Sequence, residues 1–336
     1  MNAIARNVSG WNTLVLLMAV TVLSACEKPK APEQLVFADP NQPMAALAYI
    51  AEANGYFKDE NLTVTYKKFT SGRDCVNSVL GGESDVGVAT EFPFANSILQ
   101  GKDLRIIGTL YRTNDNAAVV ARRDRGIGKA ADLVGKRIGL APNTNSDYML
   151  SVILREAGIA DDAVTRVALQ PEQMADALEK GQVDAVATWA PHIVNAQARF
   201  AKDATIVLST PAYTELSMLG ARAQTIAKRK EALQRLVNAL VRAEDFANAH
   251  SAEALQLVID HMAVKQDAAL RQDWPKLKFQ VRLDNLLLTA LANEGEWLAR
   301  RARPSPAVPD YRATFAPEFL ESARTQSVTV AKAGGG

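Results

Sequence analysis

The fold is decided by two similar stretches, Asp85-Val-Gly-Val-Ala-Thr90 and Asp184-Ala-Val-Ala-Thr-Trp189. Each begins with an aspartate and continues as a short apolar run, and a proline follows soon after it, Pro93 or Pro191. Short apolar runs bounded by turn residues are typical of buried strands, and a proline in the first turn favours a following helix. Each stretch therefore predicts a buried strand that leads into a helix.

The same order of elements surrounds both stretches, which indicates an internal duplication. Upstream, Leu35-Val-Phe-Ala-Asp-Pro-Asn41 corresponds to Arg137-Ile-Gly-Leu-Ala-Pro-Asn143. Each copy then predicts a helix, a strand and a second helix before the deciding strand. Any two runs of this kind look alike, so chance similarity is the alternative, but the matching order of three anchors favours duplication. Alternating strands and helices predict an α/β fold with two lobes, each a mainly parallel sheet flanked by helices.

The remaining segments divide around these copies. Residues 104–121 predict a strand that leaves the first lobe, a hinge at Thr113-Asn-Asp-Asn116 and a strand that enters the second. From Ile226 onward the spacing of apolar residues predicts helices, at 228–248, 251–262, 266–273, 282–301 and 315–324. The predicted parts are a signal peptide (1–25), a tether (26–34), the first part of lobe 1 (35–112), lobe 2 (113–212), the return strand and C-terminal helices of lobe 1 (213–330), and a flexible tail (331–336).

The N-terminus predicts export and lipid anchoring. An apolar stretch, Thr13–Leu23, is too short to span a bilayer comfortably and ends in Leu23-Ser-Ala-Cys26, which resembles a bacterial lipobox. The pattern implies cleavage before Cys26 and attachment of lipid to that residue, leaving the domain at a bacterial membrane. A short anchor helix is the alternative. If Cys26 carries lipid, Cys75 has no partner, whereas an oxidising compartment also allows a Cys26–Cys75 disulfide.

Composition excludes several function classes. Lys and Arg together number 38 against 37 Asp and Glu, so no basic excess indicates nucleic-acid binding. With two cysteines and three histidines, the chain lacks material for a multi-Cys zinc site. It has no phosphate-binding loop, nucleophile elbow or zinc-protease motif. We therefore predict a monomer that is not an enzyme and needs no metal or cofactor.

The candidate ligand site follows from the sheets. In open α/β sheets, ligands bind beyond the carboxyl ends of the strands, close to helix N-termini that favour anions. Polar residues gather at these positions in both copies, although each could instead be an ordinary helix cap. The candidate ligand-binding residues are Asn41, Gln42, Ser71, Arg73, Thr90, Glu91, Arg112, Asn143, Thr144, Asn145, Ser146, Trp189 and His192.

Trp189 is the candidate with the most specific expected role. It ends a strand, so its ring offers a stacking face and its N–H a donor at the strand's carboxyl end. The alternative is a core tryptophan that fills the lobe. Arg73 and Arg112 could neutralise an anion, and Glu91 and Glu215 could meet a cationic part of a ligand, but all four could equally be exposed or structural.

Two segments carry a resemblance to a known family: Ala131-Asp-Leu-Val-Gly-Lys-Arg-Ile-Gly139 and Asp184-Ala-Val-Ala-Thr-Trp-Ala-Pro191. They resemble the aliphatic-sulfonate, taurine and nitrate binding proteins of ABC importers, a group that includes the thiamine-pyrimidine binding proteins. The resemblance covers about 35–220 and implies a periplasmic-binding-protein fold with the ligand between the lobes. Relatives often place an acidic residue after the tryptophan, where this chain has Ala190, so a cation-recognising role is not carried over.

Together with the N-terminal lipobox, the resemblance implies a lipid-anchored receptor that closes around a small polar or anionic solute, sulfonate-like, nitrate-like or resembling a thiamine precursor. It would deliver this solute to the permease and ATPase subunits of an ABC importer. Two alternatives remain open: a lipoprotein sensor that presents the bound solute to a signalling partner, and an enzyme of pyrimidine-type chemistry. The fungal pyrimidine-synthesising relatives use a cysteine-rich motif that this chain lacks.

Overall fold

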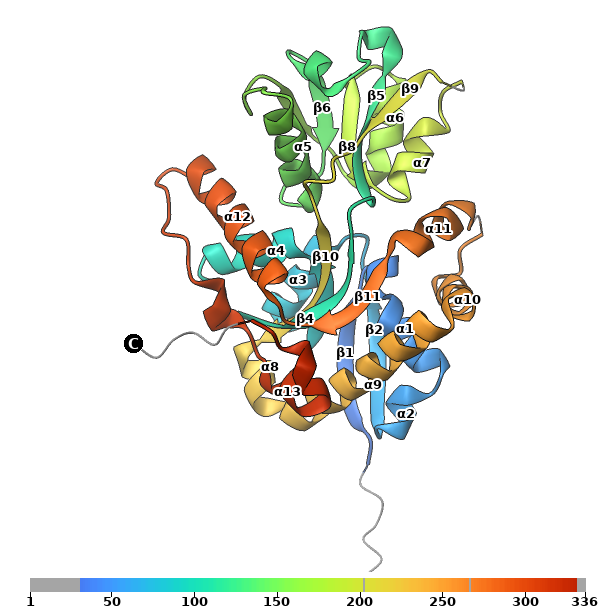
Figure 1. The fold of residues 1–336 in the computed structure, drawn as a ribbon, viewed down its shortest axis with the longest axis vertical. Helices are drawn as coiled ribbons and strands as arrows, with labels where there is room; N and C mark the ends of the chain where they lie inside the picture. The colour runs from blue at the N-terminus through green and yellow to red at the C-terminus, as the bar shows by residue number, and fades with distance from the viewer. Residues whose placement is uncertain (1–30, 202, 266, 331–336) are drawn as a thin grey trace, which may run out of the picture. The chain divides into compact units, whose positions relative to one another are not determined.

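Two β-sheets organise the chain, and they define the two lobes of the computed structural model (Figure 1). The structure describes residues 31–201, 203–265 and 267–330, so Cys26, the signal segment and the tail lie outside the described residues. From Pro32 onward the chain forms one compact unit.

The sheet of lobe 1 has the strand order β11-β4-β10-β3-β1-β2. Its strands are β1 (Glu33–Asp39), β2 (Leu62–Lys68), β3 (Val86–Thr90), β4 (Leu104–Thr113), β10 (Glu215–Arg222) and β11 (Lys278–Arg282). The sheet of lobe 2 has the order β7-β6-β8-β5-β9. Its strands are β5 (Ala117–Arg122), β6 (Arg137–Leu140), β7 (Thr165–Ala168), β8 (Ala185–Trp189) and β9 (Thr205–Leu208).

The predicted α/β class is confirmed, but both sheets are mixed. Within lobe 1, β1 pairs in parallel with β2 and β3, whereas β10 is antiparallel to β3 and β4. Within lobe 2, β6 pairs in parallel with β7 and β8, whereas β5 is antiparallel to β8 and β9. In lobe 2 the strand that runs against the others is β5, which arrives from lobe 1. In lobe 1 two strands run against the others: β10, which arrives from lobe 2, and the edge strand β11. The chain passes between the lobes twice, from β4 to β5 and from β9 to β10.

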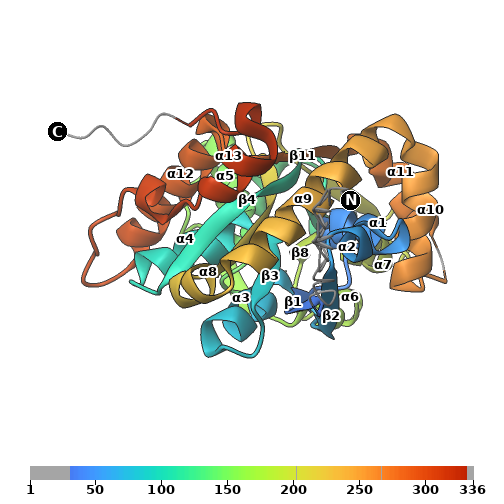
Figure 2. The ribbon, with the colours of Figure 1, turned by 90° about the horizontal axis from the view of Figure 1, so that it is seen from below.

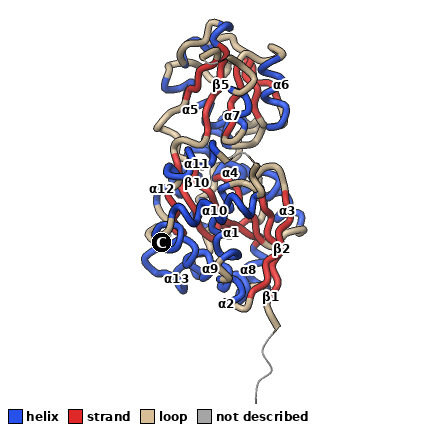
Figure 3. Tube along the Cα trace, turned by 90° about the vertical axis from the view of Figure 1, so that its right-hand side faces the viewer, coloured by secondary structure: helices blue, strands red, loops and turns tan. Residues whose placement is uncertain are grey.

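Helices flank both sheets. In lobe 1, α3 packs against β3, and α9 packs against α1, α10 and α13; Figure 2 shows α9 lying beside α1. In lobe 2, α5 and α6 pack against β8 (Figure 3). The helices before the second crossing are α1 (Ala46–Ala53), α2 (Tyr56–Asp59), α3 (Gly72–Gly81), α4 (Glu91–Leu99), α5 (Asn145–Glu156), α6 (Met174–Glu179) and α7 (His192–Gln197). Those after it are α8 (Ala223–Lys228), α9 (Lys230–Ala249), α10 (Ser251–Met262), α11 (Ala268–Asp273), α12 (Asn285–Arg301) and α13 (Glu318–Arg324).

The two predicted copies share a side-chain hydrogen bond and a backbone turn at equivalent positions. Asp85 accepts the backbone N–H of Val36 at 2.8 Å, and Asp184 accepts that of Arg137 at 2.9 Å. In both copies the aspartate before the central strand therefore clamps the first strand of the same copy. The asparagine after each first strand adopts a left-handed backbone, with φ of 50° at Asn41 and 59° at Asn143.

The C-terminal third differs from its prediction at one element. The prediction of helices alone after Ile226 is wrong at β11, which pairs antiparallel with β4 at the sheet edge. This strand is five residues long, too short for its alternation of polar and apolar residues to stand out between two helices. The helices α9 to α13 otherwise begin and end within a few residues of the predicted ranges.

The core is continuous across the lobes at one place besides the two crossing strands. Phe92 of α4 and Trp297 of α12 belong to the same buried apolar cluster as Tyr148 of α5. The ring centroids of Phe92 and Tyr148 lie 6.3 Å apart, and those of Tyr148 and Trp297 lie 5.7 Å apart. Helix α12 therefore joins lobe 1 to lobe 2 through aromatic packing.

Candidate functional site

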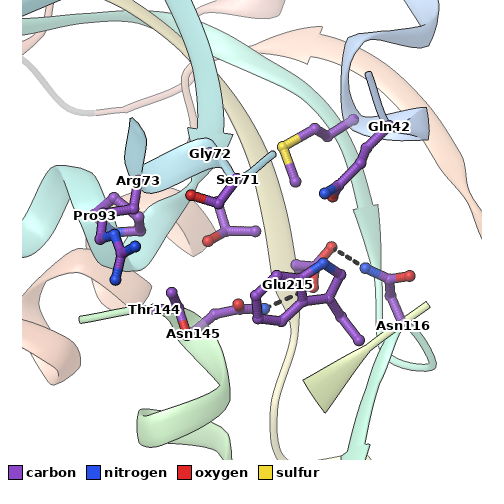
Figure 4. Close-up of a pocket in the computed structure, with 12 residues that line it drawn as sticks. Gln42, Ser71, Gly72, Arg73, Pro93, Asn116, Thr144, Asn145 and Glu215 are labelled. Atoms are coloured by element: carbon purple, nitrogen blue, oxygen red, sulfur yellow. Dashed lines mark hydrogen bonds between the residues drawn. The ribbon is translucent and has the colours of Figure 1, made fainter. Parts of the chain in front are cut away.

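A cavity lies where the carboxyl ends of the strands of the two lobes meet (Figure 4). We call it the polar chamber. Its walls come from the segments after β1, β2, β3, β6 and β8 and from the two crossing segments. The lining residues are Gln42, Met44, Ser71, Gly72, Arg73, Thr90, Pro93, Asn116, Thr144, Asn145, Trp189 and Glu215.

Seven of the predicted site residues are brought together here: Gln42, Ser71, Arg73, Thr90, Thr144, Asn145 and Trp189. Two of them stand at helix N-termini from opposite lobes, Ser71 before α3 and Asn145 at the start of α5. The positive ends of both helix dipoles therefore face one space. Trp189 is buried, and its Nε1–H has no hydrogen-bond partner among the described residues.

Several polar groups at the chamber have structural partners. Ser71 caps α3 by accepting the backbone N–H of Asp74 at 3.2 Å. The Thr144 hydroxyl donates to the Ala141 carbonyl at 2.8 Å. Thr90 makes no capping hydrogen bond although it occupies the N-cap position of α4, so its hydroxyl is available at the chamber wall. Ser71 thus both caps its helix and lines the chamber, whereas Thr90 lines the chamber without capping its helix.

Two hydrogen bonds close the chamber between the lobes. Arg73 of lobe 1 donates from Nη1 to the carbonyl of Pro142 in lobe 2 at 3.0 Å. Asn145 of lobe 2 donates from Nδ2 to Oε2 of Glu215 on β10 at 2.8 Å. The described conformation is therefore one in which the lobes contact each other across the site.

Glu215 lines the chamber although it is not among the predicted ligand-binding candidates; the sequence suggested only that it could meet a cationic part of a ligand. It is fully buried, and Oε1 accepts hydrogen bonds from Tyr111 at 2.9 Å and Asn116 at 2.8 Å. Burial, reinforced by the charge of Glu91, raises the pKa of this carboxyl to about 7 against the lowering effect of its donors. Asn116 lies in the predicted hinge, and Glu215 lies at the start of the predicted return strand; both are at a crossing between the lobes, which places them at the cleft.

Other chamber residues have steric roles. A Cβ at Gly72 would lie 2.8 Å from Cα of Ala89, so only glycine lets α3 begin this close to β3. Met44 follows Gln42 at the end of the first strand segment, and Pro93 lies in the first turn of α4. The sequence places Pro93 at a helix start but gives no sign that it faces a cavity.

The other predicted site residues lie outside the chamber walls. Glu91 points into the core, where it accepts hydrogen bonds from Tyr213 and from the backbone N–H of Leu216. Arg112 is exposed on the outer side of β4, because side chains alternate along a strand and Tyr111 takes the inner side.

The remaining candidates border the site. Asn41 donates its backbone N–H to Asp39, and Asn143 is exposed and lines a separate recess beside Arg73. The Ser146 hydroxyl is buried against that of Thr144 at 2.9 Å. His192 packs edge-on to Trp189, with ring centroids 5.6 Å apart, and burial lowers its pKa.

Glu91 meets a second buried carboxyl, Glu294 of α12. Burial raises the pKa of both groups, and the charge of Glu91 raises that of Glu294 further. Glu91 accepts hydrogen bonds from Tyr213 and from the backbone of Leu216, whereas the Glu294 oxygens have no donor among the described residues. We therefore assign the proton of the pair to Glu294 and the negative charge to Glu91.

Among the described residues, no group of three or more His, Cys, Asp or Glu side chains is arranged to hold a metal ion. The same residues include no helix that is both long enough and apolar enough to cross a membrane. Cys75 is a free, buried thiol whose pKa is raised by burial.

Residues 42–254, well over half of the chain, match the family model described as NMT1/THI5 like. The chain belongs to the NMT1/THI5-like family. The resemblance drawn from the sequence is thereby confirmed. The matched span includes every residue that lines the polar chamber.

Relatives of this family member include periplasmic binding proteins. It is 29% identical over 153 residues to the taurine-binding periplasmic protein of Escherichia coli, covering 45% of this chain and 47% of that protein. The chain thus matches about half of that protein's length. It is 24% identical over 235 residues to a putative thiamine biosynthesis protein of Haemophilus influenzae, covering 68% of this chain and 73% of that one.

Solved structures show the same fold. The aliphatic sulphonate binding protein SsuA of Escherichia coli superposes with a TM-score of 0.70 at 18% identity, covering 86% of this chain and 99% of SsuA. The desulfurization enzyme DszB, solved with biphenyl-2-sulfinic acid, superposes with a TM-score of 0.62 at 19% identity, covering 88% and 99%. The periplasmic-binding-protein fold predicted from the sequence is confirmed, and its neighbours include an enzyme.

Proposed function

We propose that this family member is the lipid-anchored solute receptor of an ABC importer and that its polar chamber captures an organic sulfonate or a similar small anion. The observation that carries the proposal is the donor set of the chamber: the buried, unpartnered Nε1–H of Trp189 together with the N-termini of α3 and α5. An acceptor with several oxygens satisfies such a set. The taurine-binding relative and the fold shared with SsuA support the sulfonate.

Closure around the ligand is the mechanism we infer. The contacts Arg73–Pro142 and Asn145–Glu215 join the lobes across the chamber. Opening requires that these two bonds part and that the crossing segments near Asn116 and Glu215 bend, while the contacts of α12 with lobe 2, among them the Arg301–Asp161 ion pair, rearrange or act as the pivot. A bound anion would add bonds to both lobes at once, which favours the closed state.

Glu215 sets the pH dependence of capture. Since its pKa is about 7, it is ionised above that pH and neutral below it. An ionised carboxylate repels a sulfonate in the same chamber, so the affinity is expected to fall as pH rises through about 7. Its three donors already occupy the carboxylate, which disfavours a second role as the receptor of an ammonium group.

The chamber supports binding rather than catalysis. Its described walls contain no cysteine and no histidine, and Cys75 is buried in the lobe 1 core. The fold shared with DszB leaves the enzyme class open at the level of fold alone, so absence of turnover is part of the proposal. Delivery to a permease follows from the relatives, whose names describe binding proteins.

The test is a thermal-shift and titration series with methanesulfonate, taurine, nitrate and acetate on the purified protein and on Glu215→Gln. We expect methanesulfonate to bind more tightly at pH 6 than at pH 8, and Glu215→Gln to remove most of that difference. Glu296→Gln, on the exposed side of α12, is the matched control. Absence of binding by every anion would overturn the proposal.

Anchoring is tested separately, through Cys26. We expect Cys26→Ala to abolish incorporation of labelled fatty acid while the released domain keeps its unfolding temperature. Label retained on the variant would contradict the lipid-anchored part of the proposal and leave the ligand part untouched.

A further inference from the structure

A second cavity adjoins the polar chamber, and its walls are apolar. We call it the apolar chamber. It encloses about 100 Å³ and shares Gln42, Met44 and Asn116 with the polar chamber. Its other walls include Met262, Val264, Leu270 and Leu277, which lie at and beyond the end of α10 and around α11. Lobe 2 contributes Ala190 and Pro191.

The polar groups in this wall are turned to other partners. Tyr111 and Asn116 both donate to Glu215, and Gln42 donates to the carbonyl of Thr70. Asp273 is paired with Lys276 at 2.9 Å. The space beyond Gln42 and Asn116 therefore offers apolar contacts and no unpaired charge among the described residues.

We propose that the apolar chamber is a subsite for the hydrocarbon part of the ligand, so that the preferred solute is an amphiphilic anion with a chain or ring of several carbons rather than a short, fully polar one. This rests on the proposed function of the polar chamber. In Figure 4, Gln42 and Asn116 lie on the side of the polar chamber opposite Arg73 and Pro93. A head group beside Arg73 therefore directs its carbon chain toward the shared wall.

Several of the apolar walls lie outside the span that matches the family model. Met262, Val264, Leu270 and Leu277 all lie beyond residue 254, where the match to the family model ends. The polar chamber lies wholly within the matched region, whereas the apolar chamber combines residues of that region with residues of the C-terminal helices. Tail recognition would therefore depend on a part of the sequence that head-group recognition does not use.

The experiment is a chain-length series with three head groups: alkanesulfonates, alkanoates and alkylammonium ions from one carbon to eight. Titrations on the full protein are expected to show sulfonate affinity rising about three- to fourfold per added methylene until the chamber is full. Taurine is expected to bind no more tightly than methanesulfonate. Sulfonate affinity that is independent of chain length would overturn the tail subsite and leave the proposed function standing, whereas no binding by any head group would overturn both.

Substitutions locate the subsite. Leu270→Asn and Val264→Thr are expected to flatten the chain-length dependence while methanesulfonate affinity stays unchanged, and Leu270→Met is expected to retain it. Leu257→Asn, on α10 but outside both chambers, is the matched control. If Leu270→Asn is unfolded, the conservative Val264→Thr decides the question. An undiminished slope in folded Val264→Thr and Leu270→Asn would place the tail elsewhere.

Discussion

The two copies of the duplicated unit share their order of elements and the aspartate hydrogen bond to the first strand. They differ in the helices that come after their central strands. In the first copy, β3 ends at Thr90 and leads into the nine residues of α4, which pack against α12. In the second, β8 ends at Trp189 and leads into the six residues of α7, with no counterpart of α12 over it. The residue after the first strand end, Glu91, is consequently buried in the core, whereas its counterpart after the second strand end, Ala190, lies at the apolar chamber. Whether the residue after a strand end becomes core or lines a cavity is decided by the segment that later covers it.

The copies also differ in which strand carries glycine where the first strand pairs with the central strand. Ala38 pairs with Gly87 in the first copy, and Gly139 pairs with Val186 in the second. A Cβ at Gly87 would lie 2.9 Å from Cγ2 of Val79 and 3.2 Å from the carbonyl oxygen of Cys75, because α3 passes directly over β3. A Cβ at Gly139 would meet mainly a terminal methyl group of Leu169.

The largest expected effect comes from placing a larger side chain at the glycine of either copy. Gly87→Val, which introduces the residue that the second copy carries at this position, is expected to lower the free energy of unfolding by about 3 kcal/mol or to prevent folding, since backbone atoms of α3 must move. Gly139→Ala is expected to cost about 1 kcal/mol, because the Leu169 side chain can rotate away. Urea unfolding of both variants measures the difference. Equal costs would mean that α3 yields at Gly87 as easily as the Leu169 side chain does at Gly139.

The second prediction concerns the buried carboxyl pair that only the first copy has. The pKa of Glu294 is raised in the folded protein, so its stabilising contribution is complete below its unfolded pKa and declines as pH rises through the folded value. Glu294→Gln keeps a hydrogen-bond donor for Glu91 but cannot ionise, so its contribution to stability does not decline as pH rises. Relative to the unaltered protein, the variant is expected to gain about 1–2 kcal/mol in unfolding free energy between pH 5 and pH 8.

The control for this pair is Glu296→Gln, two residues along the same helix and exposed. Its unfolding free energy is expected to follow that of the unaltered protein at both pH values. A constant difference between Glu294→Gln and the unaltered protein across this range would contradict the assignment of the proton to Glu294.

The third prediction sharpens the comparison at the strand ends. Trp189→Phe removes the unpartnered Nε1–H but keeps an aromatic face, and the affinity for methanesulfonate is expected to fall about tenfold, the loss of one hydrogen bond of about 1.4 kcal/mol. Thr90→Val removes the hydroxyl at the equivalent position of the first copy. Its effect on the affinity for methanesulfonate is expected to be smaller, because a neutral hydroxyl can rotate to other orientations. Thermal unfolding without ligand, measured in parallel, separates affinity from stability. Unchanged affinity in both variants would remove the strand ends from the site.

Much of this could be predicted from the sequence, because it depends on local patterns. Apolar runs, helix-start prolines and the repeated Asp-apolar stretches predicted both copies, and strand ends predicted polar candidates such as Thr90 and Asn145. The mixed pairing of the sheets was not predicted, since it depends on the direction in which β5 and β10 enter. Strand β11 was missed because five residues between helices give a weak periodic signal.

The remainder depends on contacts between distant segments. Glu91 and Ala190 follow equivalent strands, and only the position of α12, two hundred residues later in the chain than Glu91, places the first in the core and leaves the second at the apolar chamber. The place of Glu215 in the chamber depends on donors from Tyr111, Asn116 and Asn145, which no local pattern brings together. The apolar chamber likewise arises where the ends of α10 and α11 meet residues near Gln42.

The smallest expected effect tests what the copies share most closely. Asn41 and Asn143 both have positive φ, a conformation that costs a residue with a Cβ about 1–2 kcal/mol and that asparagine tolerates better than most. Asn41→Ala and Asn143→Ala are therefore expected to lower the free energy of unfolding by similar amounts, about 1 kcal/mol each. Asn41→Gly and Asn143→Gly are expected to be close to neutral.

This pattern separates a backbone role from a ligand role at the same two positions. If the asparagine side chains serve only to permit the left-handed turn, glycine restores stability in both copies and leaves methanesulfonate affinity unchanged. Asn143 borders the recess beside Arg73, so a ligand role there would appear as affinity lost in both Asn143→Ala and Asn143→Gly, with normal stability in the glycine variant. Asn41 donates its backbone N–H to Asp39, a bond that glycine retains. A loss of affinity confined to the second copy would therefore mean that the duplicated turn has acquired a binding function in one lobe alone.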